Sequence, residues 1–386
     1  MNWSIQKAKE FCLGVTDGTH DSPKAVDVGR YLITSKHLGE YEIDFCSAKM
    51  ISEDDYKKVI ARSKVGQWDI LFSMIGTIGN CYLEKNKSVK YACKNMGIFQ
   101  MGGDEEKAYW LYYYLKSPQA KRYVLSHLRG STQQYIPLGS LREFPIPIPE
   151  KGNRIKIIDI LKSIDGKIET NNKINENLLQ QAGAVFDKFY DESSNQQSFT
   201  SLIDVLGGGT PKTGNPDFWN GPIPFFTPKD VGAPYTFQTE KYITESGLAH
   251  CNSRLYQKDT TFVTARGTVG KVSLAGTPMA MNQSCYALAS ETVDPLLVYF
   301  YVLKAVASLK HKASGAVFDA IVTRDFDSET INTLSDDDSK MVLSIIRPIM
   351  GAIHNNIEEN MRLASLRDSL LPKLMSGELD VSELDI

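Results

Sequence analysis

Hydrogen-bonding side chains recur in the turn-rich stretches of this sequence, and loops are where binding residues concentrate. Arg and Lys can donate to guanine, Asn and Gln can pair with adenine, and small polar groups can bind phosphate oxygens. The candidate DNA contacts of these types are Thr19, His20, Lys36, His37, Gln133 and Gln134 in the first part of the chain, and Thr210, Lys212, Lys229, Arg266, Lys312 and Arg324 in the second. Each could equally face water, and His20 and His37 could instead be hydrogen-bonding residues inside turns.

Motifs for base methylation and nucleotide hydrolysis are incomplete. Residues 215–218 read Asn-Pro-Asp-Phe, whereas amino-group methylation of a base needs Asn/Asp-Pro-Pro-aromatic, so we interpret this stretch as a turn. In residues 207–213, Pro211 stands where a phosphate-binding loop needs the glycine before lysine. The sequence offers no recognisable Ser/His/Asp arrangement and no metal-ligand cluster. We therefore expect a non-catalytic chain with no metal and no cofactor of its own.

Composition and charge fit a globular protein with two or three domains. The chain has 386 residues, 42% of them hydrophobic, and no apolar run long enough to cross a bilayer. Residues 1–10 lack the apolar core of a signal peptide. The six cysteines form no CxxC pair and do not group with the histidines, which favours reduced thiols in the cytoplasm. With a net charge of −3, any DNA-binding surface must be local or shared with partners.

Two long stretches with a heptad pattern lie 185 residues apart in the sequence. We expect them to form the helices that position the loops with the candidate residues. Their alternating spacing of four and three residues is that of a coiled-coil seam. The seam positions are Ile157, Leu161, Ile164, Ile168, Asn171, Asn175, Leu178, Ala182, Val185 and Phe189, followed by Val342, Ile346, Ile349, Ile353, Asn356, Asn360, Leu363, Arg367, Leu370 and Leu374. Only Arg367 interrupts the second seam. The alternative, two unrelated amphipathic helices, does not explain asparagine pairs that coincide at one offset.

The asparagines predict how the two helices meet. A buried seam asparagine fixes register and partner at a cost in stability. If the helices run antiparallel, Asn171 lies opposite Asn360 and Asn175 lies opposite Asn356, so all four can pair. A parallel arrangement would also match like with like, but the chain would then have to return a full helix length. We predict an antiparallel pair of about 37 residues each, a spacer roughly 55 Å long.

The globular segments repeat as well. Gly-Thr-Ile-Gly at 76–79 and Gly-Thr-Val-Gly at 267–270 each follow a predicted strand, at 67–74 and 260–264. At the helix offset, Gly130, Ile136, Leu141 and Ile146 become Gly315, Ile321, Phe326 and Ile331. The predicted division is 1–150, a first domain; 151–192, a central helix; 193–335, a second domain; and 336–386, a C-terminal helix and tail. The fold class is therefore α+β, with two mixed domains joined by two antiparallel coiled-coil helices in a pseudo-twofold, circular repeat.

The order of short phrases resembles one protein family over essentially the whole chain. These phrases are Asp-Gly-Thr-His at 17–20, Gly-Thr-Ile-Gly at 76–79, Ile-Pro-Ile-Pro at 146–149, Gly-Gly-Thr-Pro at 208–211, Phe-Trp-Asn-Gly at 218–221, Ile-Pro at 223–224 and Leu-Pro-Lys-Leu-Met-Ser-Gly-Glu-Leu at 371–379. The sequence resembles the specificity (S) subunit of type I restriction–modification systems. One departure is that residues 150–154 lack the acidic-Gln stretch often seen at the start of the first long helix.

The resemblance implies a subunit that reads double-stranded DNA and catalyses nothing itself. Each of two target recognition domains would read one half of an asymmetric, bipartite target. The implied partners are two modification subunits, which carry S-adenosylmethionine and methylate adenine, and restriction subunits for cleavage; ATP and Mg²⁺ would likewise be bound by partners. No membrane association is expected. The main alternative is a coiled-coil adaptor that binds proteins without reading DNA, and a second is a stand-alone DNA-modifying enzyme.

Overall fold

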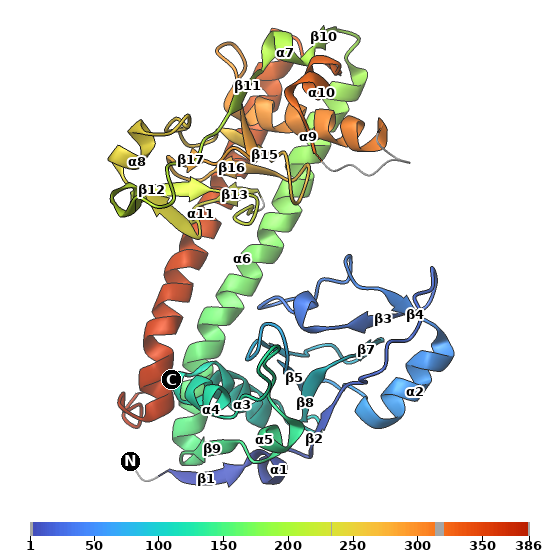
Figure 1. Cartoon of the computed structure of the whole chain (residues 1–386), viewed down its shortest axis with the longest axis vertical. Helices are drawn as coiled ribbons and strands as arrows, with labels where there is room; N and C mark the ends of the chain where they lie inside the picture. The colour runs from blue at the N-terminus through green and yellow to red at the C-terminus, as the bar shows by residue number, and fades with distance from the viewer. Residues whose placement is uncertain (1–2, 233, 313–319, 385–386) are drawn as a thin grey trace. The chain divides into compact units, whose positions relative to one another are not determined.

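The computed structural model describes residues 3–232, 234–312 and 320–384, and the chain divides into two compact units (Figure 1). Unit 1 comprises Met1–Glu169 and Arg362–Ile386, and unit 2 comprises Thr170–Met361. Each unit thus combines a globular part with one stretch of each long helix. The predicted boundaries at 150, 192 and 335 stay predictions, and Gly315, a predicted repeat position, lies outside the described residues.

Short helices and strands of unit 1 alternate, and side-chain caps fix several helix starts. Ser52 accepts a hydrogen bond from the Asp55 N–H, and Ser117 accepts one from the Ala120 N–H. The elements of its globular part are β1 (Ser4–Lys7), α1 (Ala8–Phe11), β2 (Gly14–Asp17), β3 (Arg30–Ile33), the 3₁₀ turn η1 (Ser35–His37), β4 (Met50–Ile51), α2 (Glu53–Ser63), β5 (Ile70–Ser73), β6 (Cys81–Leu83), β7 (Tyr91–Cys93), β8 (Met96–Gln100), α3 (Glu105–Lys116), α4 (Pro118–Ser126), α5 (Leu138–Arg142) and β9 (Pro145–Ile148).

Unit 2 repeats this order with insertions. Its elements are β10 (Gln196–Ser198), α7 (Phe199–Leu202), β11 (Asp204–Gly207), the 3₁₀ turn η2 (Pro216–Phe218), β12 (Trp219–Phe226), β13 (Tyr235–Thr236), β14 (Lys241–Ile243), α8 (Glu245–Ala249), β15 (Thr261–Thr264), β16 (Val272–Ala275), β17 (Ala280–Met281), β18 (Cys285–Ala289), α9 (Pro295–Lys312), α10 (Thr323–Asp327) and β19 (Thr330–Asn332). The predicted strands before the two Gly-Thr-[Ile/Val]-Gly motifs are confirmed as β5 and β15.

Sheet topology confirms the repeat. The order β2-β8-β5-β6 in unit 1 recurs as β11-β18-β15-β16 in unit 2, where β13 joins the β16 edge. The order β4-β3-β7 recurs as β14-β12-β17, and β1-β9 recurs as β10-β19. In both copies of the three-stranded sheet, the central strand pairs in parallel with one neighbour, as β3–β7 or β12–β17. Two α+β units built to one plan therefore form the described chain.

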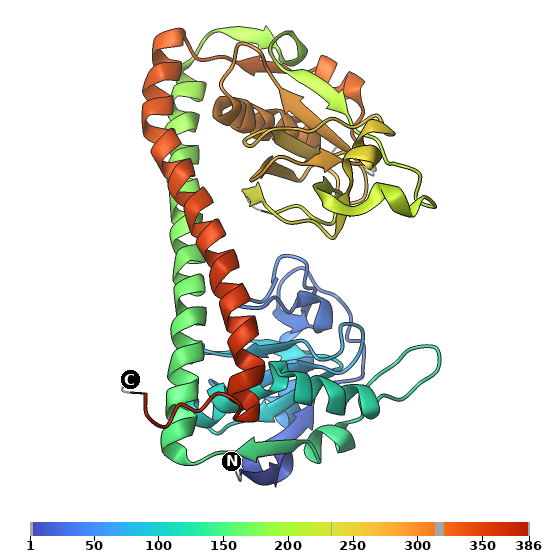
Figure 2. The ribbon, with the colours of Figure 1, turned by 90° about the vertical axis from the view of Figure 1, so that its left-hand side faces the viewer.

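The long helices α6 (Lys151–Glu192) and α11 (Asp336–Ser376) run antiparallel within each unit, as Figure 2 shows. In unit 2 the Asn171 Nδ2 donates to Asn360 Oδ1, and the Asn356 Nδ2 donates to Asn175 Oδ1, each over 2.8 Å. Asn171 is only 1% exposed, so its amide depends on these protein partners. The predicted antiparallel helix pair is confirmed, with the asparagines opposite one another in the expected order.

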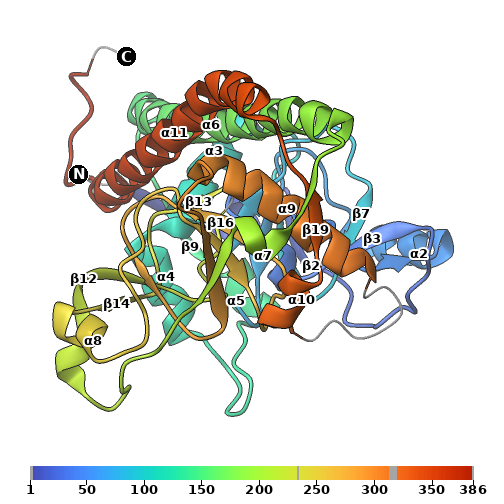
Figure 3. The same cartoon turned by 90° about the horizontal axis from the view of Figure 1, so that it is seen from above.

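The predicted seam shifts by one residue where unit 2 packs on the helices. Phe186 is fully buried while the predicted Val185 and Phe189 are only partly so, and Met350 is buried in place of Ile349. The cause is α9, which lies between the sheet and the helix pair (Figure 3) and stacks Phe300 on Phe186 with ring centroids 5.1 Å apart. Each helix here buries a face wider than a two-helix seam, because it contacts a third helix.

We expect a double-mutant cycle to detect the Asn171–Asn360 contact. Asn171→Leu should lower the free energy of unfolding by about 1–3 kcal/mol, because it leaves the Asn360 Oδ1 without this donor. Asn171→Leu combined with Asn360→Leu should cost less than the two single changes added together, as measured by urea unfolding. Asn171→Leu combined with Ser117→Ala, which removes the α4 cap, is the matched control and should be additive. Additive effects at the asparagine pair would contradict the contact.

Candidate nucleic-acid interface

In unit 1, the loops that carry most candidate residues meet at one edge. Because β3 and β7 are parallel, the η1 turn and the Lys94–Asn95 turn leave from the same edge. Thr19 forms a parallel bridge with Lys94, and Ile75 forms an antiparallel bridge with Tyr135. A Cβ on Gly76 would lie 3.3 Å from the Ser35 Oγ, which ties these segments together. We call residues 18–22, 34–37, 75–79, 94–95 and 129–135 loop cluster 1.

Unit 2 builds the same edge from different residues. The Asn282 N–H donates to the Phe226 carbonyl over 3.0 Å, and the Gly209 N–H donates to the Met281 carbonyl over 3.2 Å. Thr268 Oγ1 donates to the Pro228 carbonyl over 3.3 Å, joining two further loops. We call residues 208–212, 227–230, 265–270, 282–284 and 320–322 loop cluster 2. The parallel pair β12–β17 organises it as β3–β7 organises the first.

The repeated Gly-Thr-[Ile/Val]-Gly motif forms the same turn in both clusters. Gly76 and Gly79 have φ of 76° and 96°, and Gly267 and Gly270 have φ of 82° and 73°, values that favour glycine. The Gly79 N–H donates back to the Ser73 carbonyl, and the Gly270 N–H donates back to Thr264. Each strand, β5 or β15, therefore ends in a tight turn whose tip lies in its loop cluster.

His20 is held in cluster 1 by a polar network that leaves its ring largely open to solvent. Its Nε2 lies 3.0 Å from Asp17 Oδ2 and its Nδ1 lies 2.9 Å from Asn95 Oδ1. Asp17 is only 8% exposed, and its Oδ1 accepts a hydrogen bond from Arg62 Nη2 over 3.0 Å. The imidazole is thus positioned at the edge with an exposed face, where it could contact a phosphate or a base.

Lys36, Gln133 and Gln134 also lie exposed in cluster 1. In cluster 2, Lys212, Lys229 and Arg266 are exposed, and Thr210 Oγ1 donates to Gln283 Oε1. Lys229 Nζ lies 3.7 Å from Glu240 Oε2, a weak surface pair that a phosphate could replace. These candidates share one edge within their own unit.

Three candidates are placed differently. His37 is 2% exposed, and its Nδ1 accepts a hydrogen bond from the Thr34 N–H over 2.9 Å. Lys312 Nζ pairs with Glu329, whose side chain is buried. Arg324 is exposed on α10, just beyond cluster 2. The structure therefore gives His37 and Lys312 structural partners: the ring closes a turn, and the ammonium neutralises a buried carboxylate.

Residues 25–180 and 196–361 each match the family described as type I restriction modification DNA specificity domain. The chain belongs to this family. It is 27% identical over 163 residues to the type I restriction enzyme MjaIX specificity subunit of Methanocaldococcus jannaschii, covering 41% of this chain and 38% of that protein. It is 22% identical over 337 residues to the HindI specificity subunit of Haemophilus influenzae, covering 66% of this chain and 73% of that one.

A solved structure shares the fold of this specificity protein. The type I restriction-modification S subunit from M. genitalium has a TM-score of 0.54 and 14% sequence identity, covering 97% of this chain and 96% of that one. Within residues 3–232, 234–312 and 320–384, no three His, Cys, Asp or Glu side chains are grouped to hold a metal ion. No helix in that part of the chain has both the length and the apolarity to cross a membrane.

Sequence reasoning missed Arg62, Lys94 and Asn95 of this specificity protein as residues of the site. Arg62 lies at the end of α2 and reaches Asp17, which is 45 residues away in the chain. Lys94 Nζ contacts Ser22 Oγ, and Asn95 contacts His20. Local spacing could not bring them together. Asn95 reaches His20 because β2 pairs with β8, with Asp17 opposite Gly97, and Arg62 reaches Asp17 because α2 packs beside β2. The sequence offered one weak signal: α2 has acidic residues in its first turn and the basic Arg62 in its last turn.

We expect His37 to make stability depend on pH. Burial of the ring, with the charge of Lys36 adding to it, lowers the His37 pKa below its ordinary value. The unfolded chain then takes up the proton first, so this contribution is complete above about pH 6.5 and is lost as the pH falls. Urea unfolding between pH 7.5 and 5 should show a shallower decline for His37→Asn than for the unaltered protein. Identical declines would show that the ring does not titrate differently on folding.

Proposed function

We propose that this chain is the DNA sequence-specificity subunit of a type I restriction–modification complex, and that each loop cluster reads one half of a bipartite target. Family membership supports the assignment to such a system. The observation that carries the reading role is the duplicated edge: two units of one plan present exposed donors on loops that parallel strands bring together. Loops on a rigid scaffold are where binding residues concentrate.

The two clusters differ in the groups they present, which predicts an asymmetric target. Cluster 1 offers His20, Lys36 and the Gln133–Gln134 pair, and amides suit adenine. Cluster 2 offers Lys212, Lys229 and Arg266, cations that suit guanine and phosphate. The net charge of −3 places the attraction for DNA in these local groups or in partners.

We propose that catalysis belongs to the partners. Two modification subunits carrying S-adenosylmethionine would dock on the chain, and restriction subunits that use ATP and Mg²⁺ would join for cleavage, all in the cytoplasm. The repeat supports two copies of one partner, because identical partners need similar docking surfaces. Each unit contributes one stretch of α6 and one of α11, so each offers the same kind of helical surface.

The first experiment maps methylated adenines in a host that expresses the chain with its neighbouring modification subunit. A split, asymmetric motif should appear only when both proteins are present. Replacing residues 1–150 with the same segment of another family member should change one half of the motif and leave the other half intact. Absence of chain-dependent methylation, together with no salt-sensitive DNA binding by the complex, would favour the adaptor that binds only proteins.

A single side chain tests cluster 2. Arg266→Ala should relax discrimination in the half-site that unit 2 reads, by about 1–3 kcal/mol if the guanidinium pairs with guanine. Competition binding of the assembled complex to single-base variants of the mapped motif measures this. Arg347→Ala is the matched control: it also removes one arginine from unit 2, but Arg347 lies on α11 and pairs with Asp294. If Arg266→Ala and Arg347→Ala lose the same amount of discrimination, Arg266 contributes only positive charge and does not read a base.

A further inference from the structure

Arg367, the residue that interrupts the apolar seam, forms a buried ion pair between the two helices of unit 1. Its Nη1 lies 2.9 Å from Asp165 Oδ1, and the two residues are 5% and 4% exposed. Removing both charges from water carries a large desolvation cost, which further hydrogen bonds must offset. A seam built only for stability would be apolar at this level, so the pair needs another explanation.

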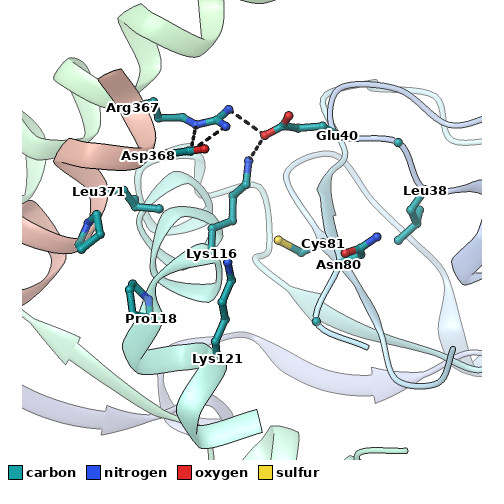
Figure 4. A pocket seen from close by; sticks show the side chains of 13 residues that line it. Leu38, Glu40, Asn80, Cys81, Lys116, Pro118, Lys121, Arg367, Asp368 and Leu371 are labelled. Atoms are coloured by element: carbon teal, nitrogen blue, oxygen red, sulfur yellow. Dashed lines mark hydrogen bonds and ion pairs between the residues drawn. The ribbon is translucent and has the colours of Figure 1, made fainter. Parts of the chain in front are cut away.

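Arg367 also pairs with Asp368, the next residue of α11, through Nη2 over 2.8 Å. Its other partners come from one short segment of the globular part. Arg367 Nη1 also lies 2.6 Å from Tyr41 Oη and 2.7 Å from Glu40 Oε1, and the Tyr41 O–H donates to Asp165 Oδ1 over 2.9 Å. Lys116 Nζ holds the same Glu40 Oε1 at 2.7 Å. Figure 4 shows Glu40 between Arg367 and Lys116, with dashed lines to both. Polar contacts thus join this segment to both long helices and to α3.

The segment is a hairpin that begins at η1. The Asp44 N–H donates to the His37 carbonyl, Leu38 bridges Ile43, and the tip carries Glu40 and Tyr41. A pocket of about 500 Å³ lies between residues 38–40, 79–81 and 367–372. The base of the hairpin packs into the core of unit 1 through Leu38 and Ile43. Across the pocket, the tip contacts add the polar attachment of the hairpin to α11. The base of the hairpin is η1, which belongs to cluster 1.

Unit 2 makes the corresponding attachment without charge. At the 185-residue offset, the two partners of the ion pair become Ala182 and Met350, both fully buried. The segment after β12 instead packs aromatic rings on α11: His354 lies 5.2 Å from Tyr235 and 4.7 Å from Phe237, between ring centroids. The two helices therefore pack with an apolar pair at these positions in unit 2. The charges of Arg367 and Asp165 occur only in unit 1, where they contact the hairpin.

We propose that Arg367 is a positioning residue for half-site reading by unit 1. The guanidinium fixes Glu40 and Tyr41, their hairpin fixes η1, and η1 holds Lys36 at the edge of cluster 1. This inference rests on the proposed function, because it concerns how one of the two reading edges is oriented. It assigns Arg367 no contact with DNA.

The test copies the unit 2 seam into unit 1. Asp165→Met with Arg367→Ala replaces the ion pair by the Met/Ala pair of unit 2 and removes the anchor of the hairpin. We expect urea unfolding to stay close to that of the unaltered protein, because an apolar pair of this kind already packs in unit 2. Discrimination in the unit 1 half-site should fall roughly 2- to 30-fold, the range expected for a coupling of this kind, while the unit 2 half-site is unchanged.

A second variant weakens the same attachment by changing the hairpin residues and not the helix residues. Glu40→Gln with Tyr41→Phe leaves the Arg367–Asp165 pair in place and removes the Glu40 charge and the Tyr41 hydroxyl that bind the guanidinium. It should loosen the same half-site, and Arg367→Lys should retain part of the discrimination that Arg367→Ala loses. All variants are read as complexes with the modification subunit, by competition binding and by methylation of single-base variants of the motif.

The outcomes separate the inference from the proposed function. If the unaltered complex shows no bipartite methylation, the proposed function is wrong and the positioning role falls with it. If the unaltered complex reads two half-sites and the hairpin variant Glu40→Gln/Tyr41→Phe discriminates as well as the original, Arg367 serves stability only and the inference is overturned. Equal losses in both half-sites would also overturn it, because a positioning role is confined to unit 1.

Discussion

Polar groups buried between α6 and α11 constrain the rest of this structure. An asparagine amide or a guanidinium withdrawn from water must find partners, and a shift of one residue along either helix would separate Asn171 from Asn360 and Arg367 from Asp165. The apolar seam positions alone would tolerate more than one register, since one aliphatic side chain can replace another. These few polar contacts therefore select one register of the helix pair. Every element that packs on the helices inherits its position from that register.

The loop clusters depend on a second constraint, the parallel pairing of β3 with β7 and of β12 with β17. Parallel strands end at the same edge, so residues distant in the chain meet there whatever their side chains are. Glycine turns with positive φ at 76–79 and 267–270 add a further loop to each edge. The backbone thus fixes the edge, and the side chains are left to differ. This is why two units of one plan can present different side chains at corresponding edges.

Sequence reasoning predicted the parts of the fold that depend on local periodicity. The heptads and the paired asparagines predicted both long helices and their antiparallel packing, because a buried polar seam residue allows few arrangements. It failed where tertiary contacts decide. Phe186 and Met350 are buried because α9 packs on the helices. The heptad pattern of two helices does not predict contact with a third helix. For His37 the sequence left two alternatives open, a DNA contact or a hydrogen-bonding residue inside a turn, and the buried ring closes the η1 turn. Asn95 meets His20 through the pairing of β2 with β8, and Arg62 meets Asp17 through the packing of α2 beside β2.

The interruption at Arg367 shows why a break in a pattern can be as informative as the pattern itself. In a duplicated scaffold, corresponding positions of the two helices are expected to carry similar side chains. In unit 2 the positions that correspond to Arg367 and Asp165 are the buried apolar residues Ala182 and Met350. Unit 1 departs from this arrangement with a charged pair whose arginine also binds Asp368 and the tip of a hairpin. Aromatic packing, as around His354, tolerates small rotations. A guanidinium shared among three carboxylates and a phenol has a narrow range of geometry. The ionic attachment therefore fixes the hairpin more tightly than the aromatic one fixes its counterpart. The chemistry that attaches each edge to the helices is therefore specific to its own unit.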